Sequence, residues 1–221
     1  MSINYRGVLI KVLGHASLRI ETTVGPVCYI DPWSEVLGTH SGDADIILIT
    51  HDDVDHYDPA AIETLATDAT TVVVCDAIDT QNLSRKVLKL ASNCELTVDG
   101  VDVRSVSAYN DPAGDHVDAD GTPYHRQGEV VGLLLTIDGT TVYYASDTDF
   151  LPEHVSINAD IYIPPIGGTY TMDRKEAAAA ARAIVPDIVI PVHYDTFEAI
   201  ETDVTAFEAE LEPTGIRVER A

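Results

Sequence analysis

Two histidines and three aspartates stand within six consecutive residues, from His51 to His56. Imidazole nitrogens and carboxylate oxygens are ligand types that zinc, manganese and iron accept in proteins. A lone His or Asp after a strand is usually a cap or turn residue, but core packing does not explain five potential ligands in one turn. This segment therefore predicts a divalent metal site.

Two other segments have the same form, a buried strand followed by a ligand type. Asp147 follows an apolar run over 140–145, and His193 follows another over 188–192. Taken alone, Asp147 reads as a turn former and His193 as a hydrogen-bonded core histidine. Together with the turn His51–His56 they indicate one site that is assembled from three strand ends.

The elements that position these groups follow from apolar periodicity and turn signals. The continuous apolar run ending at Thr50 is typical of a strand buried on both faces. Asp58-Pro59 marks a helix start, and Asp173 with Glu176 forms a capping box at another. Strands are expected over 7–12, 17–22, 27–30, 46–50, 71–75, 95–99, 101–108, 129–137, 140–145, 161–164, 188–192 and 215–219. Helices are expected after Asp58, near 78–91, over 173–184 and near 197–210.

The order of these elements favours two packed sheets with helices outside, in one domain over residues 1–221. Asp138-Gly139 joins two of the strands as a hairpin. The polar segment over 110–128 is too long for a simple connection, and loops of that length are usually functional.

The ordered series of motifs resembles the metallo-β-lactamase fold superfamily over nearly the whole chain. The branch it resembles includes the ascorbate-6-phosphate lactonase-like proteins. The motifs are Gly14-His15-Ala16-Ser17, Asp31-Pro32-Trp33, the turn His51–His56, Ala108-Tyr109-Asn110, Ala145–Asp149, Pro165–Asp173 and Pro191–Tyr194. The resemblance implies an α/β fold, a four-layer αββα sandwich, with the site at the edge between its two sheets.

The resemblance also implies two metal sites that share Asp147. In that family the turn reads His-x-His-x-Asp-His. The first site would take His51, the residue at 53, a side chain near 110 and Asp147, and the second would take Asp55, His56, Asp147 and His193. This chain departs from the pattern in having Asp53 and Asn110.

These departures affect the choice of metal. A carboxylate at 53 adds negative charge and a harder oxygen, which favours manganese, iron or magnesium over zinc at the first site. The Asn110 carbonyl is a weak ligand, so the first site is weak, substrate-assisted or empty unless His125 closes over it. His125 is equally compatible with a solvated loop position. The expected cofactor is one or two divalent ions, with Zn or Mn first and Fe as a further option.

Three residues are candidates for catalysis beside the metal. Asp55 would bind metal and orient the water, and Tyr194, or Thr169, would donate a hydrogen bond to the developing oxyanion. His15 would orient the water or a substrate oxygen, unless it is only a turn residue. The remaining histidines are expected at the surface; they are His40, His116 and His154.

The predicted activity is metal-dependent hydrolysis of a small ester, lactone or phosphodiester by a metal-activated water. The alternative is a catalytically weak protein that binds a metal or a metabolite and has a degenerate first site. Arg126 and Arg174 adjoin the predicted site loops and are candidate anion contacts, although surface roles are favoured for both.

The chain has 221 residues, 37 acidic and 13 basic side chains, and a net charge of −24, yet 45% of it is apolar. These values indicate a folded protein with an acidic surface, in keeping with adaptation to a salty cytoplasm and a halophilic source. Because lysine and arginine are few and scattered, nucleic acid and anionic membranes are excluded as partners. A small-molecule substrate is expected, and a homo-oligomer is left open.

Cys28, Cys75 and Cys94 are widely spaced and odd in number. They predict buried free thiols in a reducing compartment rather than a disulfide framework. The chain start lacks a basic and apolar leader, and no apolar run approaches the length that spans a bilayer. A cytoplasmic protein is therefore expected.

Overall fold

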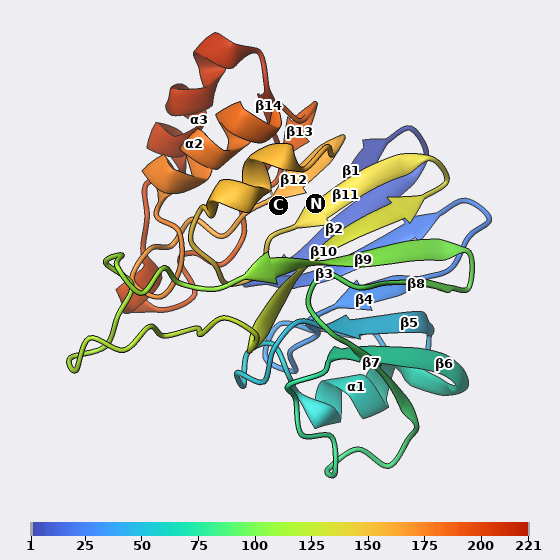
Figure 1. Ribbon diagram of the computed structural model, residues 1–221. Helices are drawn as coiled ribbons and strands as arrows, with labels where there is room; N and C mark the ends of the chain where they lie inside the picture. Colours follow the sequence, from blue (N-terminus) through green and yellow to red (C-terminus); the bar gives the residue numbers. More distant parts are fainter. Residues whose placement is uncertain (1, 221) are drawn as a thin grey trace.

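The apolar runs form fourteen strands in two sheets in the computed structural model, which describes residues 2–220 (Figure 1). The first sheet contains β1 (Ser2–Tyr5), β2 (Val8–Gly14), β3 (Ser17–Thr22), β4 (Cys28–Ile30), β5 (Ala44–Ile49), β6 (Ala66–Cys75) and β7 (Val87–Leu90). Its spatial order equals its chain order. The strands from β1 to β4 pair antiparallel, and those from β4 to β7 pair parallel.

The second half of the chain repeats this pattern. Its strands are β8 (Glu95–Val98), β9 (Val101–Ala108), β10 (Val130–Ile137), β11 (Thr140–Tyr144), β12 (Ile161–Ile163), β13 (Ile188–Val189) and β14 (Arg217–Val218). The strands from β8 to β11 pair antiparallel, and those from β11 to β14 pair parallel. Each sheet is therefore made by one continuous half of the chain, and the two halves share one topology.

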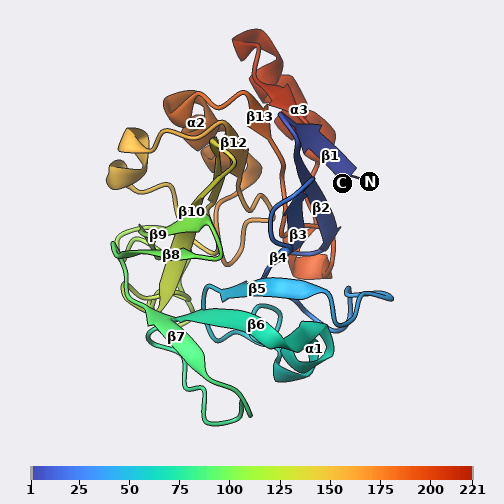
Figure 2. The ribbon, with the colours of Figure 1, turned by 90° about the vertical axis from the view of Figure 1, so that its right-hand side faces the viewer.

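Helices cover the outer faces of both sheets (Figures 1 and 2). They are α1 (Pro59–Leu65), α2 (Arg174–Ile184) and α3 (Val204–Leu211), with short 3₁₀ helices η1 (Pro152–Ser156), η2 (Glu198–Ile200) and η3 (Glu212–Thr214). Asp58 caps α1 through the N–H groups of Ala60 and Ala61, and Asp173 caps α2. Four alanines of α2 are buried against the second sheet, where their small size lets the helix lie close to it. The predicted αββα sandwich is confirmed.

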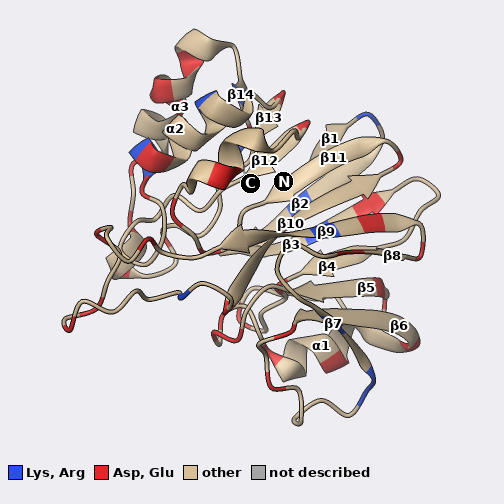
Figure 3. Ribbon diagram, viewed as in Figure 1, with Lys and Arg blue, Asp and Glu red and all other residues tan. Residues whose placement is uncertain are grey.

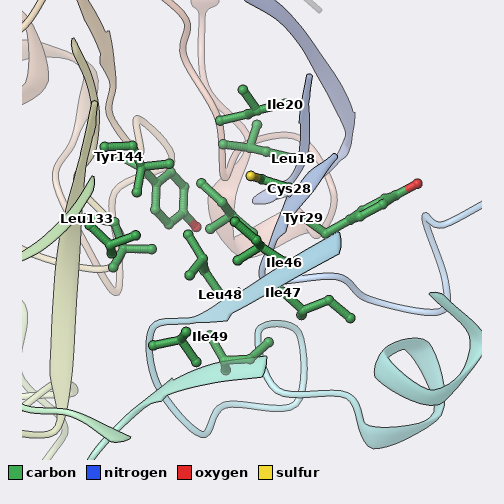
Figure 4. Packing of buried hydrophobic residues seen from close by; sticks show 14 of the residues in the cluster. Leu18, Ile20, Cys28, Tyr29, Ile46, Ile47, Leu48, Ile49, Leu133 and Tyr144 are labelled. Carbon is green, nitrogen blue, oxygen red and sulfur yellow. The ribbon is translucent and has the colours of Figure 1, made fainter. Parts of the chain in front are cut away.

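The main core lies between the sheets (Figure 4). Leu18 and Leu48 of the first sheet face Leu133 and Tyr144 of the second, and all four side chains are at most 1% exposed. The Tyr144 hydroxyl crosses this layer to donate to Asp31 Oδ2 at 3.0 Å. Burial of apolar surface on both inner faces therefore fixes the distance between the strand ends that carry the ligands.

Two predicted helices differ from the structure. Residues 78–91 form turns followed by β7 instead of a helix, because side chains such as Asp79 bond to nearby backbone and Val87–Leu90 pairs with β6. The helix expected near 197–210 begins only at Val204, which Asp203 precedes as its cap. No helix over residues 2–220 is long and apolar enough to cross a membrane.

Burial corrects three other expectations. Cys94 is exposed, whereas Cys28 and Cys75 are buried as expected. His154, expected at the surface, is fully buried and bonds through Nε2 to the Ser107 carbonyl at 2.8 Å. His116 is only partly exposed and bonds to Asp149, as described below.

Candidate metal centre

The ligand types gather at one edge of the sandwich, where strand ends of both sheets meet. His51 follows β5, Asp147 follows β11 and His193 lies beyond β13, while His125 comes from the long loop between β9 and β10. His15 lies in the turn between β2 and β3. Four residues of this region have left-handed backbone: His15, Asp31, Ser146 and His193, with φ between 45° and 59°. Such strained backbone in non-glycine residues is concentrated at functional sites.

The first subsite consists of His51, Asp53, His125 and Asp147. Asp53 Oδ2 lies 3.6 Å from His51 Nε2 and 3.3 Å from His125 Nε2. Asp147 Oδ2 lies 3.9 Å from His51 Nε2 and 3.5 Å from His125 Nε2. Two imidazole nitrogens and two carboxylates thus face one another at spacings that suit a shared cation.

The second subsite consists of Asp55, His56, His193 and Asp147. Asp147 Oδ1 lies 3.6 Å from His56 Nε2, and Asp147 Oδ2 lies 3.2 Å from His193 Nε2. Asp55 Oδ2 is 4.0 Å from His193 Nε2. Asp147, which is 3% exposed, therefore stands between the two subsites and presents an oxygen to each.

Several buried polar atoms of this centre have no hydrogen-bond partner within the described chain. Among residues 2–220, five buried side-chain nitrogen or oxygen atoms have no hydrogen-bond partner, and four belong to this cluster. They are His51 Nε2, His56 Nε2, Asp147 Oδ1 and His193 Nδ1. A buried polar atom without a partner is costly, and cations bound at the two subsites would satisfy the first three. The residues present therefore fit a divalent metal.

Asp31 orients the histidines of both subsites. Its Oδ2 accepts from His56 Nδ1 at 2.9 Å and from Thr50 Oγ1 at 2.6 Å, and His51 Nδ1 lies 3.0 Å from that hydroxyl. With each Nδ1 engaged, both Nε2 atoms are left for the centre. Asp31 itself is fully buried, and Thr50 N–H donates to its Oδ1.

The site is strongly polarised. Burial opposes ionisation of Asp147, but His193 and His56 outweigh it and hold the pKa of that carboxyl well below its usual range. Bonds from His125 and His51 likewise lower the pKa of Asp53. Burial lowers the pKa of His51, whereas at His56 the nearby Asp147 and Asp31 overcome burial and raise the pKa to about 10. The carboxylates are therefore ionised and ready to bind a cation.

His15 bonds to a predicted ligand. Its Nε2 donates to Asp55 Oδ2 at 2.8 Å and its Nδ1 lies 3.0 Å from Thr196 Oγ1. Burial lowers the pKa of His15, so the ring is neutral and accepts from Thr196 while donating to Asp55. Burial opposes the effect of that bond on Asp55, whose pKa is nevertheless lowered to about 2. The structure thus places His15 where it positions Asp55.

Asn110 supports His125. Its Oδ1 accepts from His125 N–H at 2.8 Å and lies 3.2 Å from His125 Nδ1, while its Nδ2 donates to Asp149 and to the Tyr170 carbonyl. The amide is thus occupied within the protein, in contrast to its predicted role as a metal ligand. His125, which is 5% exposed, instead presents Nε2 to the first subsite.

The Tyr194 side chain packs away from the metal cluster, which gives no support to its predicted role as a hydrogen-bond donor to an oxyanion. Its ring packs with the apolar cluster beneath α2 and α3, and Arg220 and Glu208 are the charged groups near it, besides Asp195. Although the residue follows His193, its side chain does not line the cavity over the centre. Thr169, the other candidate donor, donates to the Ala199 carbonyl.

A cavity of about 480 Å³ opens over the centre. Its walls are Asp52, Asp53, Val54, Asp55, Tyr124, His125, Asp147, Tyr170, His193 and Phe197. The aromatic residues among them were not singled out from the sequence, where no spacing marks a cavity wall. A second hollow of about 600 Å³, over Leu96, Arg104 and Thr136, has the carboxylates of Glu95 and Asp102 in its lining but no histidine.

A further His and two acids lie behind the first subsite. His116 Nδ1 is 2.6 Å from Asp149 Oδ1, and Glu176 offers an oxygen nearby. Asp149 also accepts from Asn110 and from Asp111 N–H, so its oxygens are already bonded. The bonds thus run from His116 through Asp149 and Asn110 to His125, and they brace the loop that carries this histidine.

The family of the chain follows from comparison with known proteins. Residues 9–193 match the family described as "Beta-lactamase superfamily domain". The chain belongs to the metallo-β-lactamase superfamily. Within this superfamily it is 35% identical to a UPF0173 metal-dependent hydrolase from Methanosphaerula palustris, over 91% of this chain and 90% of that protein. A relative of the same name from Methanosphaera stadtmanae is 30% identical, over 92% of this chain and 91% of that protein. The chain is thus a member of the UPF0173 metal-dependent hydrolase family.

Solved structures of two proteins described as metal-dependent or metallo hydrolases show the same fold. A candidate metal-dependent hydrolase from Parabacteroides distasonis superposes with a TM-score of 0.83 at 30% identity, covering 100% of this chain and 96% of that one. A metallo hydrolase from the archaeon Ignicoccus hospitalis superposes with a TM-score of 0.78 at 24% identity, covering 97% of this chain and 94% of that one. At that identity, the second likeness concerns the fold alone.

Proposed function

We propose that this member of the UPF0173 family hydrolyses a small ester, lactone or phosphodiester with two divalent cations. The observation that carries the proposal is the set of buried, unpartnered atoms His51 Nε2, His56 Nε2 and Asp147 Oδ1, which face one another across the two subsites. When bound, such cations lower the pKa of water and polarise the carbonyl or phosphoryl oxygen under attack.

The protein's own groups hold and orient the reactants. The first subsite would bind one cation through His51, Asp53, His125 and Asp147, and the second would bind the other through Asp55, His56, His193 and Asp147. Asp55, which His15 holds in place, faces the cavity and would orient the attacking water. With His125 beside Asp53, the first subsite has a full set of ligands, which disfavours a catalytically weak binding protein.

The metal assignment follows from the donor atoms. The second subsite has two imidazoles and two carboxylates, a set that zinc and manganese both accept. The first subsite also has two carboxylates because Asp53 stands where the resembled pattern has His. We therefore propose Zn or Mn, with Fe as a further option, at both subsites, because their donor sets are the same.

The experiment combines metal content with turnover. Purified protein should retain up to two divalent ions per chain by elemental analysis, and should hydrolyse phenyl acetate, a γ-lactone or bis(p-nitrophenyl) phosphate with added Mn²⁺ or Zn²⁺. Asp147→Ala and His193→Ala should each abolish turnover, whereas Asp102→Asn, in an exposed pair with Thr97, should not. Absence of bound metal, or turnover that survives Asp147→Ala, would refute the proposal.

The setting proposed for this activity is the cytoplasm, with a small-molecule substrate and no nucleic acid or membrane partner. It is supported by the free thiols of the three cysteines and by the scarcity of basic residues. The resemblance to the ascorbate-6-phosphate lactonase-like branch supports lactones among the substrates to test.

A further inference from the structure

Exposed apolar side chains gather at the mouth of the metal cavity. Seven large apolar residues among the described residues are exposed, and three of them line this cavity: Val54 at 79%, Tyr124 at 40% and Phe197 at 44%. A contiguous apolar patch at a cavity indicates a binding surface, whereas single exposed apolar residues need no explanation. The chain has a net charge of −24, so a cluster of exposed apolar side chains stands out from an otherwise acidic surface.

The aromatic rings are held in pairs, one beside each subsite. The Phe197 ring lies 6.0 Å from Trp33 and 5.5 Å from His15, which bonds to Asp55 of the second subsite. Tyr124 precedes His125 of the first subsite in the chain, and its ring lies 5.0 Å from Tyr170 at an interplanar angle of 80°. Flat apolar surfaces placed in this way suit a planar or aromatic group.

The charges around the cavity are all acidic. Asp52, Asp53, Asp55 and Asp147 line it, and no lysine or arginine does. The four carboxylates would balance two divalent cations, so nothing is left to attract a further anionic group. The candidate anion contacts are engaged elsewhere, since Arg126 pairs with Glu129 and Arg174 with Glu210.

We infer that the substrate is an uncharged ester or lactone with a planar apolar or aromatic group, and not a phosphorylated or carboxylated metabolite. This inference rests on the proposed function. In the reaction, a water oxygen bonds to the acyl carbon and the acyl C–O bond breaks. One water proton ends on the released alcohol, and the carboxylic acid releases the other in forming its carboxylate. The phenyl or other planar group would lie against Phe197 or Tyr124.

Kinetics with matched esters test the charge preference. Methyl 4-acetoxyphenylacetate and 4-acetoxyphenylacetate have the same acetyl group and closely similar phenolic leaving groups, because a methylene separates the ring from the carboxyl group, and they differ in one negative charge. With the metal-loaded protein, we expect kcat/KM to be at least about tenfold higher for the neutral ester, because the charged one meets Asp52 without a cationic partner. Equal or faster turnover of the carboxylate would overturn the inference.

Substitution of the rings tests their part in binding. Phe197→Ala and Tyr124→Ala should each raise KM for the neutral aromatic ester by at least about fivefold, with kcat little changed, because they remove apolar contact and leave the ligands in place. Leu88→Ala, which removes an equally exposed side chain on β7, is the control and should leave KM unchanged. Unchanged KM in both ring variants would overturn the inference.

Binding can be measured without turnover. Trp33 is the only tryptophan of the chain and lies beside Phe197, so its fluorescence reports on this part of the cavity. Acetanilide should change the emission and bind at least about tenfold more tightly than 4-acetamidobenzoate, its carboxylated counterpart. If no ester is hydrolysed but acetanilide binds with this preference, the proposed function fails and the pocket preference stands. Preference for the anion overturns the inference whether or not an ester is hydrolysed.

Discussion

Asp31 is the residue on which both subsites depend, although it supplies no ligand atom to either. It bonds to His56 and, through Thr50, reaches His51. We expect Asp31→Asn to lower metal affinity by about 10- to 100-fold, because an amide no longer holds both rings as a carboxylate does. Competition with a chromophoric chelator measures this change.

The control is Asp102→Asn, which changes a carboxylate in an exposed pair with Thr97. It should leave metal affinity unchanged while its thermal unfolding stays close to that of the wild type. If the two variants bound metal equally well, Asp31 would have no part in orienting the ligands.

His56 gives metal binding a predictable pH dependence. In the metal-free protein its pKa is about 10, since Asp147 and Asp31 outweigh the opposing effect of burial. A cation must displace that proton, so apparent affinity should rise with pH by up to about tenfold per unit below pH 10. Titration calorimetry in buffers of different ionisation enthalpy should detect proton release near neutrality, and its absence would contradict the assignment.

The same shift affects the stability of the metal-free chain with the opposite sign. Because the folded pKa of His56 is raised, its contribution to stability is fully present below about pH 6.5 and is lost as pH rises towards 10. Metal-free protein should therefore unfold more readily as pH rises from 7 to 10, whereas metal-loaded protein should resist this change, as chemical denaturation would show.

The ligand types could be predicted from the sequence because each follows a strand that apolar composition identifies. The role of Asp31 could not be predicted, since only the fold brings it under His56 and Thr50. Which of Asn110 and His125 faces the first subsite could not be predicted either, because it depends on the conformation of the long loop over 110–128. Tyr194 was misplaced because adjacency to His193 does not determine the direction of its side chain.

At the scale of elements, Gly167 lies where the loop after β12 crosses the chain beyond β13. A Cβ at this position would stand 2.4 Å from the His193 carbonyl oxygen and 2.8 Å from Ile200 Cβ. Gly167→Ala should therefore displace the segment that carries His193, destabilise the protein by about 1–3 kcal/mol and lower metal content at the second subsite. Thermal unfolding and elemental analysis measure the two effects.

Gly100→Ala separates these effects. Gly100 has open space around it but a φ of +83°, so alanine there costs about 1–2 kcal/mol of backbone strain and contacts nothing near the metal. Both variants should unfold earlier, but only Gly167→Ala should lose metal. Full metal content in Gly167→Ala would show that this crossing does not position His193.

Most strands could be predicted because buried strands are continuous apolar runs bounded by turn residues. The Asp58 and Asp173 side chains cap their helices as predicted, since capping depends on local sequence. Glu176 does not complete the predicted capping box, because its Oε1 accepts from Phe150 N–H instead. The first strand, Ser2–Tyr5, was missed because it is short and partly polar. The segment over 78–91 was misjudged because pairing of β7 with β6 is a tertiary contact that local propensity does not contain.

At the scale of the whole molecule, acidic residues are spread over loops, helices and strands (Figure 3). With a net charge of −24, their mutual repulsion opposes folding at low ionic strength. Molar KCl shortens the screening length to about 3 Å. We expect the melting temperature of the metal-loaded protein to rise by about 5 °C or more between 0.1 M and 3 M KCl, as scanning calorimetry would measure.

A charge-reduced variant serves as the matched control. Asp68, Asp102 and Glu212 are exposed, and replacing all three with lysine removes six units of negative charge without touching the site. This variant should gain less from KCl than the parent chain. A parent that is fully stable in low salt, or an equal gain in both proteins, would argue against adaptation to salt.

The overall architecture was predictable because the order of strands and helices admits few packings, and the resemblance selected among them. One consequence of the repeated topology lies outside catalysis. The chain passes from one sheet to the other only once among residues 2–220, between β7 and β8, at Ser92 and Asn93. Each half of the chain forms one whole sheet and supplies part of the ligand set. His51 and His56 lie in the first half, and Asp147 and His193 lie in the second. A backbone nick at this point would leave two fragments, neither of which has the complete ligand set. Because only the reassembled pair would form the metal centre, added cation should favour association of the two fragments.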